Sequence, residues 1–346
     1  MDAVQLTQWK HDPEVRDVPE PEPGPGQVLV RVGGAGLCHS DLHLIHDFES
    51  GMVPFEPPFT LGHENAGWVE ALGAGVSRLE VGQPVAVYGP TGCGQCRRCI
   101  QGLENYCERQ GELTSMAAGL GTDGGMARYM LVDDPRHLLP LGDLDPVQAA
   151  PLTDAALTPY HAIKRSLGLL VPGSSVVVIG VGGLGYMGVQ LLEVLTGATV
   201  IAVDTRRSAL DMAASAGAEH TVTAGESAAP EIAELTGGKG ADVVLDFVGN
   251  EATMQLAVAS GRSLGHITIV GIGGGSYPFS FFTVPYEASL ASTYWGSISE
   301  LIEVLELAER GLIRAEVERV PIAEVPAAYE RLARGDVNGR LVAVPE

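Results

Sequence analysis

The chain has 346 residues, 45% of them hydrophobic, and this length suits two domains of ordinary size, each with its own core. Its 43 acidic residues outnumber the 21 basic ones, which leaves a net charge of −22 at neutral pH. A surface of this sign excludes nucleic acid and anionic membranes as natural partners. The charge fits either adaptation to high salt or an ordinary solvated surface.

The N-terminal residues and the apolar segments predict neither a targeting signal nor a membrane span. The start, MDAVQLTQWKHDPEV, has no basic stretch followed by an apolar run. The most apolar later stretch, VVVIGVGGLGYMGV, is broken by glycines and is shorter than the roughly 18 residues that a span needs. We therefore expect a cytoplasmic protein, in which clustered cysteines are more often metal ligands or redox groups than disulfides.

The first part of the chain reads as short β-strands separated by Gly and Pro. The strand-like runs lie at 28–32, 65–75, 84–89 and 126–134. They predict an irregular, mostly β domain over residues 1–154, in which residues 92–108 form a cysteine-rich lobe.

From about residue 155, apolar strands alternate with helical patterns. In chain order these elements are 174–180 (strand), 183–195 (helix), 198–204 (strand), 207–218 (helix), 241–249 (strand), 251–262 (helix) and 266–273 (strand). The alternation predicts a parallel sheet covered by helices on both faces, over residues 155–294. Two amphipathic helices at 298–313 and 322–335 and a strand at 340–345 complete the chain.

A glycine motif, GxGxxG, stands between the strand at 174–180 and the helix that follows. Its first glycine permits a tight turn, the second lets the backbone approach a pyrophosphate, and the third lets helix and strand pack closely. A carboxylate, Asp204, ends the next strand, close to the offset of about 20 residues expected for a group that binds the adenosine ribose. The predicted cofactor residues are Gly180, Gly182, Gly183, Gly185, Asp204 and Arg206.

Asp204 also bears on the choice of cofactor. Its charge would repel a 2′-phosphate, so we expect NAD rather than NADP. Arg206 and Arg207, just beyond it, could soften that preference.

Four of the five cysteines lie within residues 92–107, at Cys93, Cys96, Cys99 and Cys107. Four thiolates at this spacing can surround one tetrahedral Zn²⁺ without ligands from distant segments, as in closed structural sites. Such a site has no vacancy for a substrate, so we predict that it holds together a loop without a core of its own. An iron–sulfur cluster and a redox dithiol are the alternatives.

Only Cys38 then remains for a catalytic metal, and the other ligands must come from His, Asp or Glu. The candidates lie in GLCHSDLH at 36–43 and LGHENAG at 61–67. An open zinc site polarises a carbonyl or lowers the pKa of an alcohol, which suits hydride transfer to a nicotinamide.

Together these motifs resemble those of the zinc-dependent medium-chain alcohol dehydrogenases. The similar segments are GAGLCHSD at 34–41, GHENAGWV at 62–69, the four-cysteine lobe and the GxGxxG turn. The chain is similar, more narrowly, to bacterial NAD-dependent secondary-alcohol dehydrogenases. The resemblance implies an α/β protein with a GroES-like β-barrel catalytic domain, 1–154 plus 295–346, a Rossmann NAD-binding domain at 155–294, and an active site in the cleft between them.

The resemblance also implies a role for each residue near Cys38. Cys38, His63 and Asp154 would hold the catalytic zinc, which brings the expected total to two zinc ions per chain. Glu64 would lie just outside the ligands, and Asp41 would orient the histidine.

A proton relay is implied as well. Ser40 would lie next to the substrate oxygen and His43 would pass the proton toward solvent. His46 could serve in place of His43. His39 would lie near the cofactor pyrophosphate.

Two further assignments have structural alternatives. Asp154 also suits the N-cap of a helix, in which case His161 would replace it as ligand. Tyr294 and Trp295 resemble the aromatic wall of a substrate pocket, although such residues also occur in cores and interfaces.

These expectations describe a zinc-dependent alcohol dehydrogenase that interconverts small-molecule alcohols, mainly secondary and including aryl and alkyl ones, with ketones or aldehydes. The alternatives are a polyol dehydrogenase, a zinc-free quinone reductase and a non-catalytic cofactor-binding protein on the same scaffold. The family association implies a homodimer or homotetramer.

Overall fold

The structure is a computed structural model that describes residues 1–345, and it divides into two compact units. The first unit comprises Met1–Leu157 and Gly296–Glu346, and the second comprises Thr158–Trp295. No helix among the described residues is long and apolar enough to cross a membrane.

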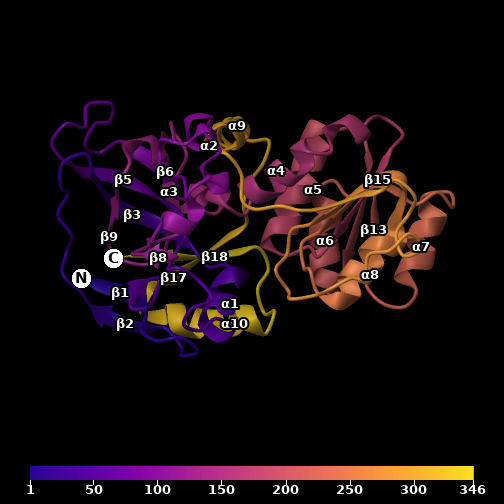
Figure 1. The fold of residues 1–346 in the computed structure, drawn as a ribbon, viewed down its shortest axis with the longest axis horizontal. Coiled ribbons are helices and arrows are strands. Elements are labelled where there is room, and N and C mark those ends of the chain that lie inside the picture. Colours follow the sequence, from indigo (N-terminus) through magenta and orange to yellow (C-terminus); the bar gives the residue numbers. More distant parts are fainter. Residues whose placement is uncertain (346) are drawn as a thin grey trace. The chain divides into compact units, whose positions relative to one another are not determined.

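The first unit is built on β-sheets (Figure 1). Its largest sheet has the order β10-β6-β5-β3-β18-β17, with β9 also paired to β3, while β2-β1-β4 and β7-β8 form two small sheets. The strands are β1 (Asp2–Leu6), β2 (Glu14–Asp17), β3 (Val28–Gly36), β4 (Phe59–Thr60), β5 (Glu64–Leu72), β6 (Pro84–Val87), β7 (Ala117–Ala118), β8 (Gly121–Thr122), β9 (Tyr129–Val132), β10 (Leu138–Pro140), β17 (Val317–Pro321) and β18 (Arg340–Val344).

The helices of this unit are mostly short. They are α1 (His39–His46), α2 (Arg97–Ile100), α3 (Pro146–Ala149), α9 (Ile298–Glu309) and α10 (Val325–Ala333), with the 3₁₀ helices η1 (Glu104–Tyr106), η2 (Gln110–Glu112), η3 (Pro135–His137), η4 (Ala150–Thr153) and η6 (Ile322–Glu324). α4 (Leu157–Lys164) begins at the last residue before the second unit. α9 begins with a capping box, in which the side chains of Ser297 and Glu300 each accept a hydrogen bond from the backbone N–H of the other.

The core of the first unit joins segments from both ends of the chain. Val30 on β3, Met126, Tyr329 on α10 and Leu341 on β18 belong to one buried apolar cluster. β18 pairs antiparallel with β3, with Val342 opposite Gly36. The C-terminal strand therefore lies beside the segment that leads into Cys38.

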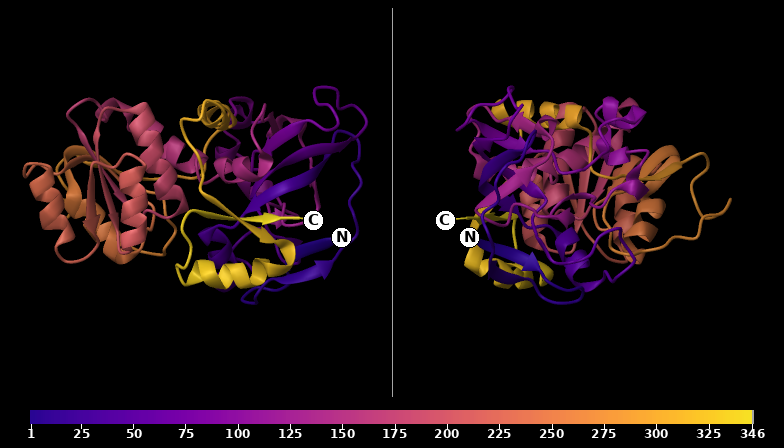
Figure 2. Two further views of the ribbon diagram at one scale, coloured as in Figure 1. Left: turned by 180° about the vertical axis from the view of Figure 1, so that it is seen from behind. Right: turned by 60° about the vertical axis from the view of Figure 1, so that its left-hand side comes forward.

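The second unit contains one parallel sheet of order β13-β12-β11-β14-β15-β16, with helices on both of its faces (Figure 2). Its strands are β11 (Ser175–Ile179), β12 (Thr199–Asp204), β13 (His220–Thr223), β14 (Ala241–Asp246), β15 (Gly261–Ile269) and β16 (Ser289–Ser292). Its further helices are α5 (Gly183–Leu195), α6 (Arg207–Ser215), α7 (Ala228–Leu235), α8 (Glu251–Ser260) and η5 (Leu167–Leu169). The predicted parallel, helix-covered sheet is confirmed.

Sequence reasoning identified β11, β12, β14 and β15 but missed β13, β16 and α7. β13 and β16 have four residues each, and neither contains the apolar run that marks a buried strand. The order of the strands changes direction at β11, which has β12 on one side and β14 on the other. Ligands of such sheets bind at the carboxyl ends of the strands at this point.

Candidate active site and metal centres

Four potential ligand side chains of the first unit converge on one point. Cys38, His63, Glu64 and Asp154 each offer an atom, and these atoms all lie within 4.8 Å of one another. Cys38 follows β3 and caps α1, while His63 immediately precedes β5 and Glu64 begins it. The antiparallel pairing of β3 with β5 places Gly36 opposite Glu64, so the two sequence motifs meet.

Asp154 completes this group from a third segment, after η4. Its Oδ2 lies 3.6 Å from His63 Nε2 and 4.0 Å from Cys38 Sγ. Ligands bound to one tetrahedral Zn²⁺ at 2.0–2.3 Å are separated by about 3.3–3.8 Å. The 3.6 Å separation lies within this range and the 4.0 Å separation lies just above it, so the sulfur, the imidazole nitrogen and the carboxylate oxygen are close to the arrangement that such an ion requires.

The electrostatics around His63 favour a cation at this point. Burial by itself would lower the pKa of His63, but the carboxylates of Asp41 and Asp154 outweigh burial and raise that pKa well above its ordinary value. His63 Nδ1 lies 3.0 Å from Asp41 Oδ1, so its Nε2 faces Asp154. The positive charge that these carboxylates favour can be carried by a proton on His63 or by a metal ion bound to this group.

Glu64 is fully buried beside this group. Its Oε1 accepts a short hydrogen bond from the guanidinium of Arg340, on β18. Burial raises the pKa of Glu64 to about 7, against the opposing effect of Arg340. A Cβ on Gly36 would lie 1.9 Å from Glu64 Oε2, so this position requires glycine.

The two residues predicted for the proton relay, Ser40 and His43, contact different partners in the structure. Ser40 Oγ lies 3.2 Å from His63 Nε2, next to the prospective ligands. His43 Nδ1 lies 2.6 Å from Asp47 Oδ2, and the His43 side chain is 30% exposed. His39 and His46, at the two ends of α1, are exposed.

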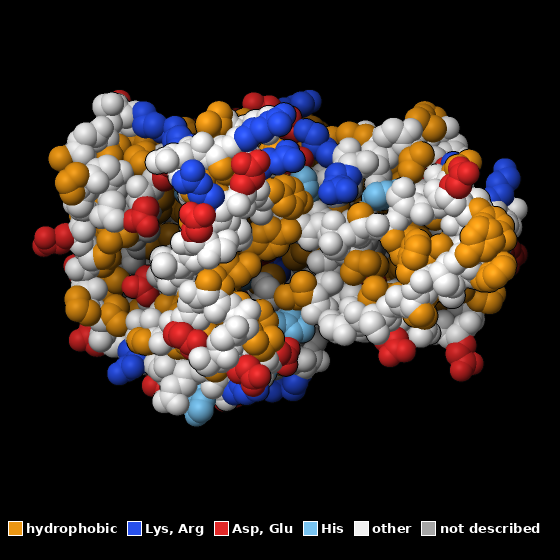
Figure 3. Space-filling model, viewed as in Figure 1, with side chains coloured by type: hydrophobic (Ala, Val, Ile, Leu, Met, Phe, Trp, Pro, Cys, Tyr) orange, Lys and Arg blue, Asp and Glu red, His pale blue; other side chains and the backbone are white. Residues whose placement is uncertain are grey.

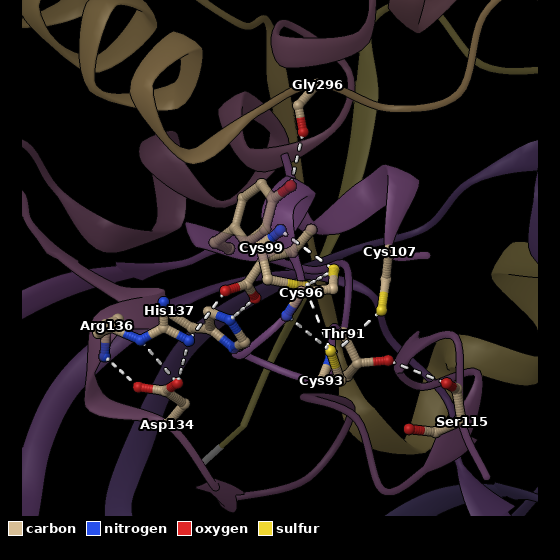
Figure 4. Close-up of polar contacts among 12 residues, drawn as sticks. Thr91, Cys93, Cys96, Cys99, Cys107, Ser115, Asp134, Arg136, His137 and Gly296 are labelled. Atoms are coloured by element: carbon tan, nitrogen blue, oxygen red, sulfur yellow. Dashed lines mark hydrogen bonds and ion pairs between the residues drawn. The ribbon is translucent and has the colours of Figure 1, made fainter. Parts of the chain in front are cut away.

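The four cysteines of the lobe form a second group of potential ligands, with their sulfur atoms turned toward one another (Figure 4). Cys96 Sγ lies 3.4 Å from Cys99 Sγ, and Cys93 Sγ lies 4.0 Å from Cys99 Sγ. Backbone N–H groups donate to the sulfurs, among them those of Cys99 and Glu108 to Cys96 Sγ. These two donors lower the pKa of Cys96 to about 6, which favours its thiolate, whereas burial raises the pKa of Cys99 and Cys107.

Buried ionic contacts connect the lobe to the segment before β10. The carboxylate of Glu104, on η1, forms an ion pair with the guanidinium of Arg136 at 2.9 Å and makes a short contact with His137. The outer face of the lobe carries exposed Arg97 and Arg98 on α2, where Figure 3 shows Lys and Arg side chains gathered.

In the second unit the glycine turn has the geometry predicted for a dinucleotide. Gly180 follows β11 with φ +85°, in the left-handed region that favours glycine. A Cβ on Gly185 would lie 1.9 Å from Gly180 O, so the close approach of the two backbone segments requires glycine at this position. A Cβ on Gly182 would meet no atom within 4 Å, so space for a ligand is open over this residue. Gly183 begins α5, whose N-terminus favours an anion.

Asp204 ends β12 next to this turn. Its Oδ2 accepts from Val181 N at 2.8 Å and its Oδ1 accepts from Arg206 N at 2.8 Å. The guanidinium Nε of Arg206 lies 3.4 Å from the same carboxylate. The structure therefore brings the predicted cofactor residues of the second unit together at the carboxyl edge of the sheet.

The predicted substrate-pocket residues lie at the end of the second unit. Trp295 is buried and has φ +53°, unusual for a bulky residue, and its ring meets that of Tyr294 nearly at right angles, with centroids 5.9 Å apart. Their role in substrate binding stays a prediction. His161, the alternative ligand to Asp154, lies on α4 in the same unit.

Comparison with known proteins identifies the family. Residues 24–143 match the alcohol dehydrogenase GroES-like domain, and residues 183–310 match the zinc-binding dehydrogenase domain. An NAD-dependent alcohol dehydrogenase of Sulfurisphaera tokodaii is 33% identical over 354 residues, covering 100% of both chains. The chain belongs to the zinc-dependent medium-chain alcohol dehydrogenase family. The predicted family and fold class are confirmed.

Other members of this family show how its activities vary. The D-arabinose 1-dehydrogenase (NADP(+)) of Saccharolobus solfataricus is 34% identical, covering 99% of this chain and 97% of that protein. The alcohol dehydrogenase structure from Aeropyrum pernix aligns with a TM-score of 0.92 at 37% identity over 100% of both chains. Acetophenone reductase from Geotrichum candidum, solved with NAD, aligns with a TM-score of 0.86 at 31% identity, over 99% of this chain and 96% of that one.

Sequence reasoning missed two residues of the dehydrogenase site, Arg340 and Tyr329. Arg340 pairs with Glu64, 276 positions away, and Tyr329 donates to Asp41, 288 positions away. No local pattern near either residue points to the site, since the connection depends on β18 and α10 packing beside β3 and α1.

Proposed function

We propose that this protein is a zinc-dependent, NAD-linked dehydrogenase that interconverts secondary alcohols, including aryl and alkyl ones, with the corresponding ketones. The convergence of Cys38, His63 and Asp154 carries this proposal. When bound, zinc would act as a Lewis acid on the substrate oxygen and NAD would accept the hydride. The named relatives that depend on NAD and the acetophenone reductase support this substrate class.

The chain's own residues would bind the metal and move the proton. Asp41 holds the imidazole of His63 so that Nε2 is available as a ligand. Ser40 Oγ, 3.2 Å from that nitrogen, is positioned to accept the proton from the substrate hydroxyl. His43, partly exposed and paired with Asp47, would release the proton to water.

We also propose that each chain holds two metal ions in unlike environments. Cys93, Cys96, Cys99 and Cys107 would hold the structural ion through four sulfurs, with no position left for a substrate. Elemental analysis of active protein should therefore give two zinc ions per chain.

A second candidate function is the oxidation of sugars or polyols. The relative named D-arabinose 1-dehydrogenase is as similar to this chain as the named alcohol dehydrogenases are. Its NADP dependence also keeps the choice of cofactor open to test. Relative rates with 1-phenylethanol, 2-propanol, sorbitol and D-arabinose distinguish the two substrate classes.

A further part of the proposal is self-association through the second unit. β16 is the edge strand of its sheet, and edge strands present unpaired backbone groups. The segment before it exposes Phe279, Phe281, Phe282 and Tyr286, with Phe282 87% exposed. A second copy of this chain, related by a two-fold axis, would cover both features.

Removal and restoration of the metal tests the proposed function. Dialysis against a chelator should abolish NADH formation with 1-phenylethanol, and added zinc should restore it. Cys38→Ser should lower kcat/KM by more than about 100-fold, since losing a mere partner of a metal ligand already costs about 10–100-fold. Full activity without metal, or in Cys38→Ser, contradicts the proposal.

A further inference from the structure

Asp41 is a fully buried carboxylate that contacts two prospective zinc ligands at once. Its Oδ2 accepts a hydrogen bond from Cys38 N at 2.9 Å, and its Oδ1 lies 3.0 Å from His63 Nδ1. The orientation of this one carboxylate therefore affects both the backbone of Cys38 and the direction of the His63 ring.

A tyrosine from the far end of the chain holds Asp41. Tyr329, on α10, donates its hydroxyl to Asp41 Oδ2 at 2.9 Å and is only 3% exposed. The same hydroxyl lies 3.3 Å from Met126 Sδ, which is a weak acceptor. Burial, together with the charge of Asp41, raises the pKa of Tyr329 well above its ordinary value, so the phenol keeps its proton and acts as the donor.

We propose that Tyr329 is a positioning residue of the catalytic metal centre, which acts by fixing the Asp41 carboxylate that orients His63 and Cys38. The inference rests on the proposed function. A carboxylate torsion has a broad energy minimum, so Asp41 depends on its hydrogen-bond donors for a single orientation. Without the phenol, Asp41 Oδ2 loses one of its two donors at a fully buried position and keeps only the N–H of Cys38.

Tyr329→Phe tests the inference, because it removes the hydroxyl and keeps the ring. Zinc release from the loaded enzyme is followed with a chromophoric chelator, and the phase absent from Cys38→Ser is assigned to the catalytic site. Partners of metal ligands contribute about 10–100-fold to metal affinity, and Tyr329 acts through such a partner. We expect release in that phase to be about tenfold faster, with release from the four-cysteine site unchanged.

Tyr88→Phe is the matched control. Tyr88 is equally buried in the same unit, and its hydroxyl donates to Gly296 O at 2.7 Å, so the variant also loses one buried phenol hydrogen bond. Tyr88→Phe should leave the Cys38-dependent phase of zinc release unchanged, even where thermal denaturation shows that both variants lose similar stability.

Three results would overturn the inference. If Tyr329→Phe releases zinc at the wild-type rate, or accelerates both phases equally, Tyr329 does not position the catalytic ligands, and the proposed function stands. If the wild-type protein shows no Cys38-dependent phase, the proposed function fails as well.

Discussion

Three buried aspartates of this protein differ in the groups that surround them. Asp41 accepts from a backbone N–H and a phenol and faces an imidazole. Asp204 accepts from two backbone N–H groups at the end of β12, beside the open glycine turn. Asp246, at the end of β14, accepts from Val248 N and Gly249 N. By our proposal, the same side chain would thus serve metal positioning at Asp41 and cofactor choice at Asp204, while Asp246 stabilises a turn.

Asp204 should decide between NAD and NADP. Asp204→Asn removes the charge that would bind the ribose hydroxyls and repel a 2′-phosphate. A hydrogen bond to a charged group contributes about 1.5–3 kcal/mol, so the ratio of kcat/KM for NAD to that for NADP should fall by about 10–100-fold. Steady-state kinetics with both cofactors measures this ratio.

The matched control for Asp204 is Asp242→Asn. Asp242 accepts from Ser175 N at 2.8 Å and pairs with Arg262, at the opposite edge of the same sheet. Asp242→Asn should leave the ratio of kcat/KM for NAD to that for NADP unchanged. An Asp204→Asn enzyme with the wild-type cofactor preference would show that Asp204 only braces the glycine turn.

Asp246 should make the stability of the protein depend on pH. Burial raises its pKa above the unfolded value of 3.8. The stability that the protonated carboxyl contributes is therefore fully present below pH 3.8 and is lost as the pH rises through the folded-state pKa. Compared with wild type, Asp246→Asn should gain stability across that window.

Denaturant unfolding at a series of pH values measures the effect of Asp246→Asn. The amide oxygen can still accept from Val248 N and Gly249 N, so the turn should persist. A stability difference between the two proteins that is constant over the acid range would contradict the raised pKa.

At the scale of elements, the cysteine lobe is the segment least able to fold by itself. α2 has four residues and η1 has three, well below the length at which isolated helices are stable. Its small apolar cluster consists of the four cysteines and Leu113. A bound metal would therefore replace the hydrophobic core that this segment lacks.

Cys99→Ala should accordingly lower the stability of the lobe more than it lowers the catalytic activity. We expect Tm to fall by several °C, since a loss of 1 kcal/mol shifts Tm by about 2–4 °C in large domains. Trypsin should cut at Arg97, Arg98 and Arg109, which are exposed on the lobe. Cys38→Ser should show the reverse, with activity lost and the lobe still protected. Rapid loss of activity without new cleavage in Cys99→Ala would contradict this division of roles.

At the scale of the whole molecule, the net charge and the exposed apolar side chains have opposite effects on self-association. The net charge of −22 disfavours association through general surface contact, because like charges repel. The aromatic segment before β16 instead concentrates apolar area, with Phe281 70% exposed. Self-association should therefore depend on this segment of the second unit.

If the protein self-associates as we propose, Phe282→Asp should reduce the proposed oligomer to smaller species. The substitution places a charge in the surface that a second copy would cover, and like charges meet across a two-fold axis. Light scattering after size exclusion measures the mass at several protein concentrations. Val81→Asp, at a 66% exposed apolar residue of the first unit, should leave the mass unchanged. If Phe282→Asp keeps the wild-type mass, the proposed interface is wrong.

The sequence by itself determined the alternation of strands and helices that predicts a parallel sheet, the glycine turn and the four-cysteine group, because each is a pattern of residues close together in the chain. α5 spans Gly183–Leu195, as the helical pattern predicts. The spacing of Cys93, Cys96, Cys99 and Cys107 likewise brings four sulfurs together within one short segment. The family resemblance implied Cys38, His63 and Asp154 as a set, although nothing local in the chain connects them.

Only the tertiary structure decided how that set is supported. Arg340 reaches Glu64 because β18 pairs with β3, and Tyr329 reaches Asp41 because α10 lies in the same core. β13 and β16 likewise owe their strand conformation to parallel neighbours and not to an apolar run of their own. Contacts between residues hundreds of positions apart depend on how the chain returns on itself, and no local pattern of residues encodes that path.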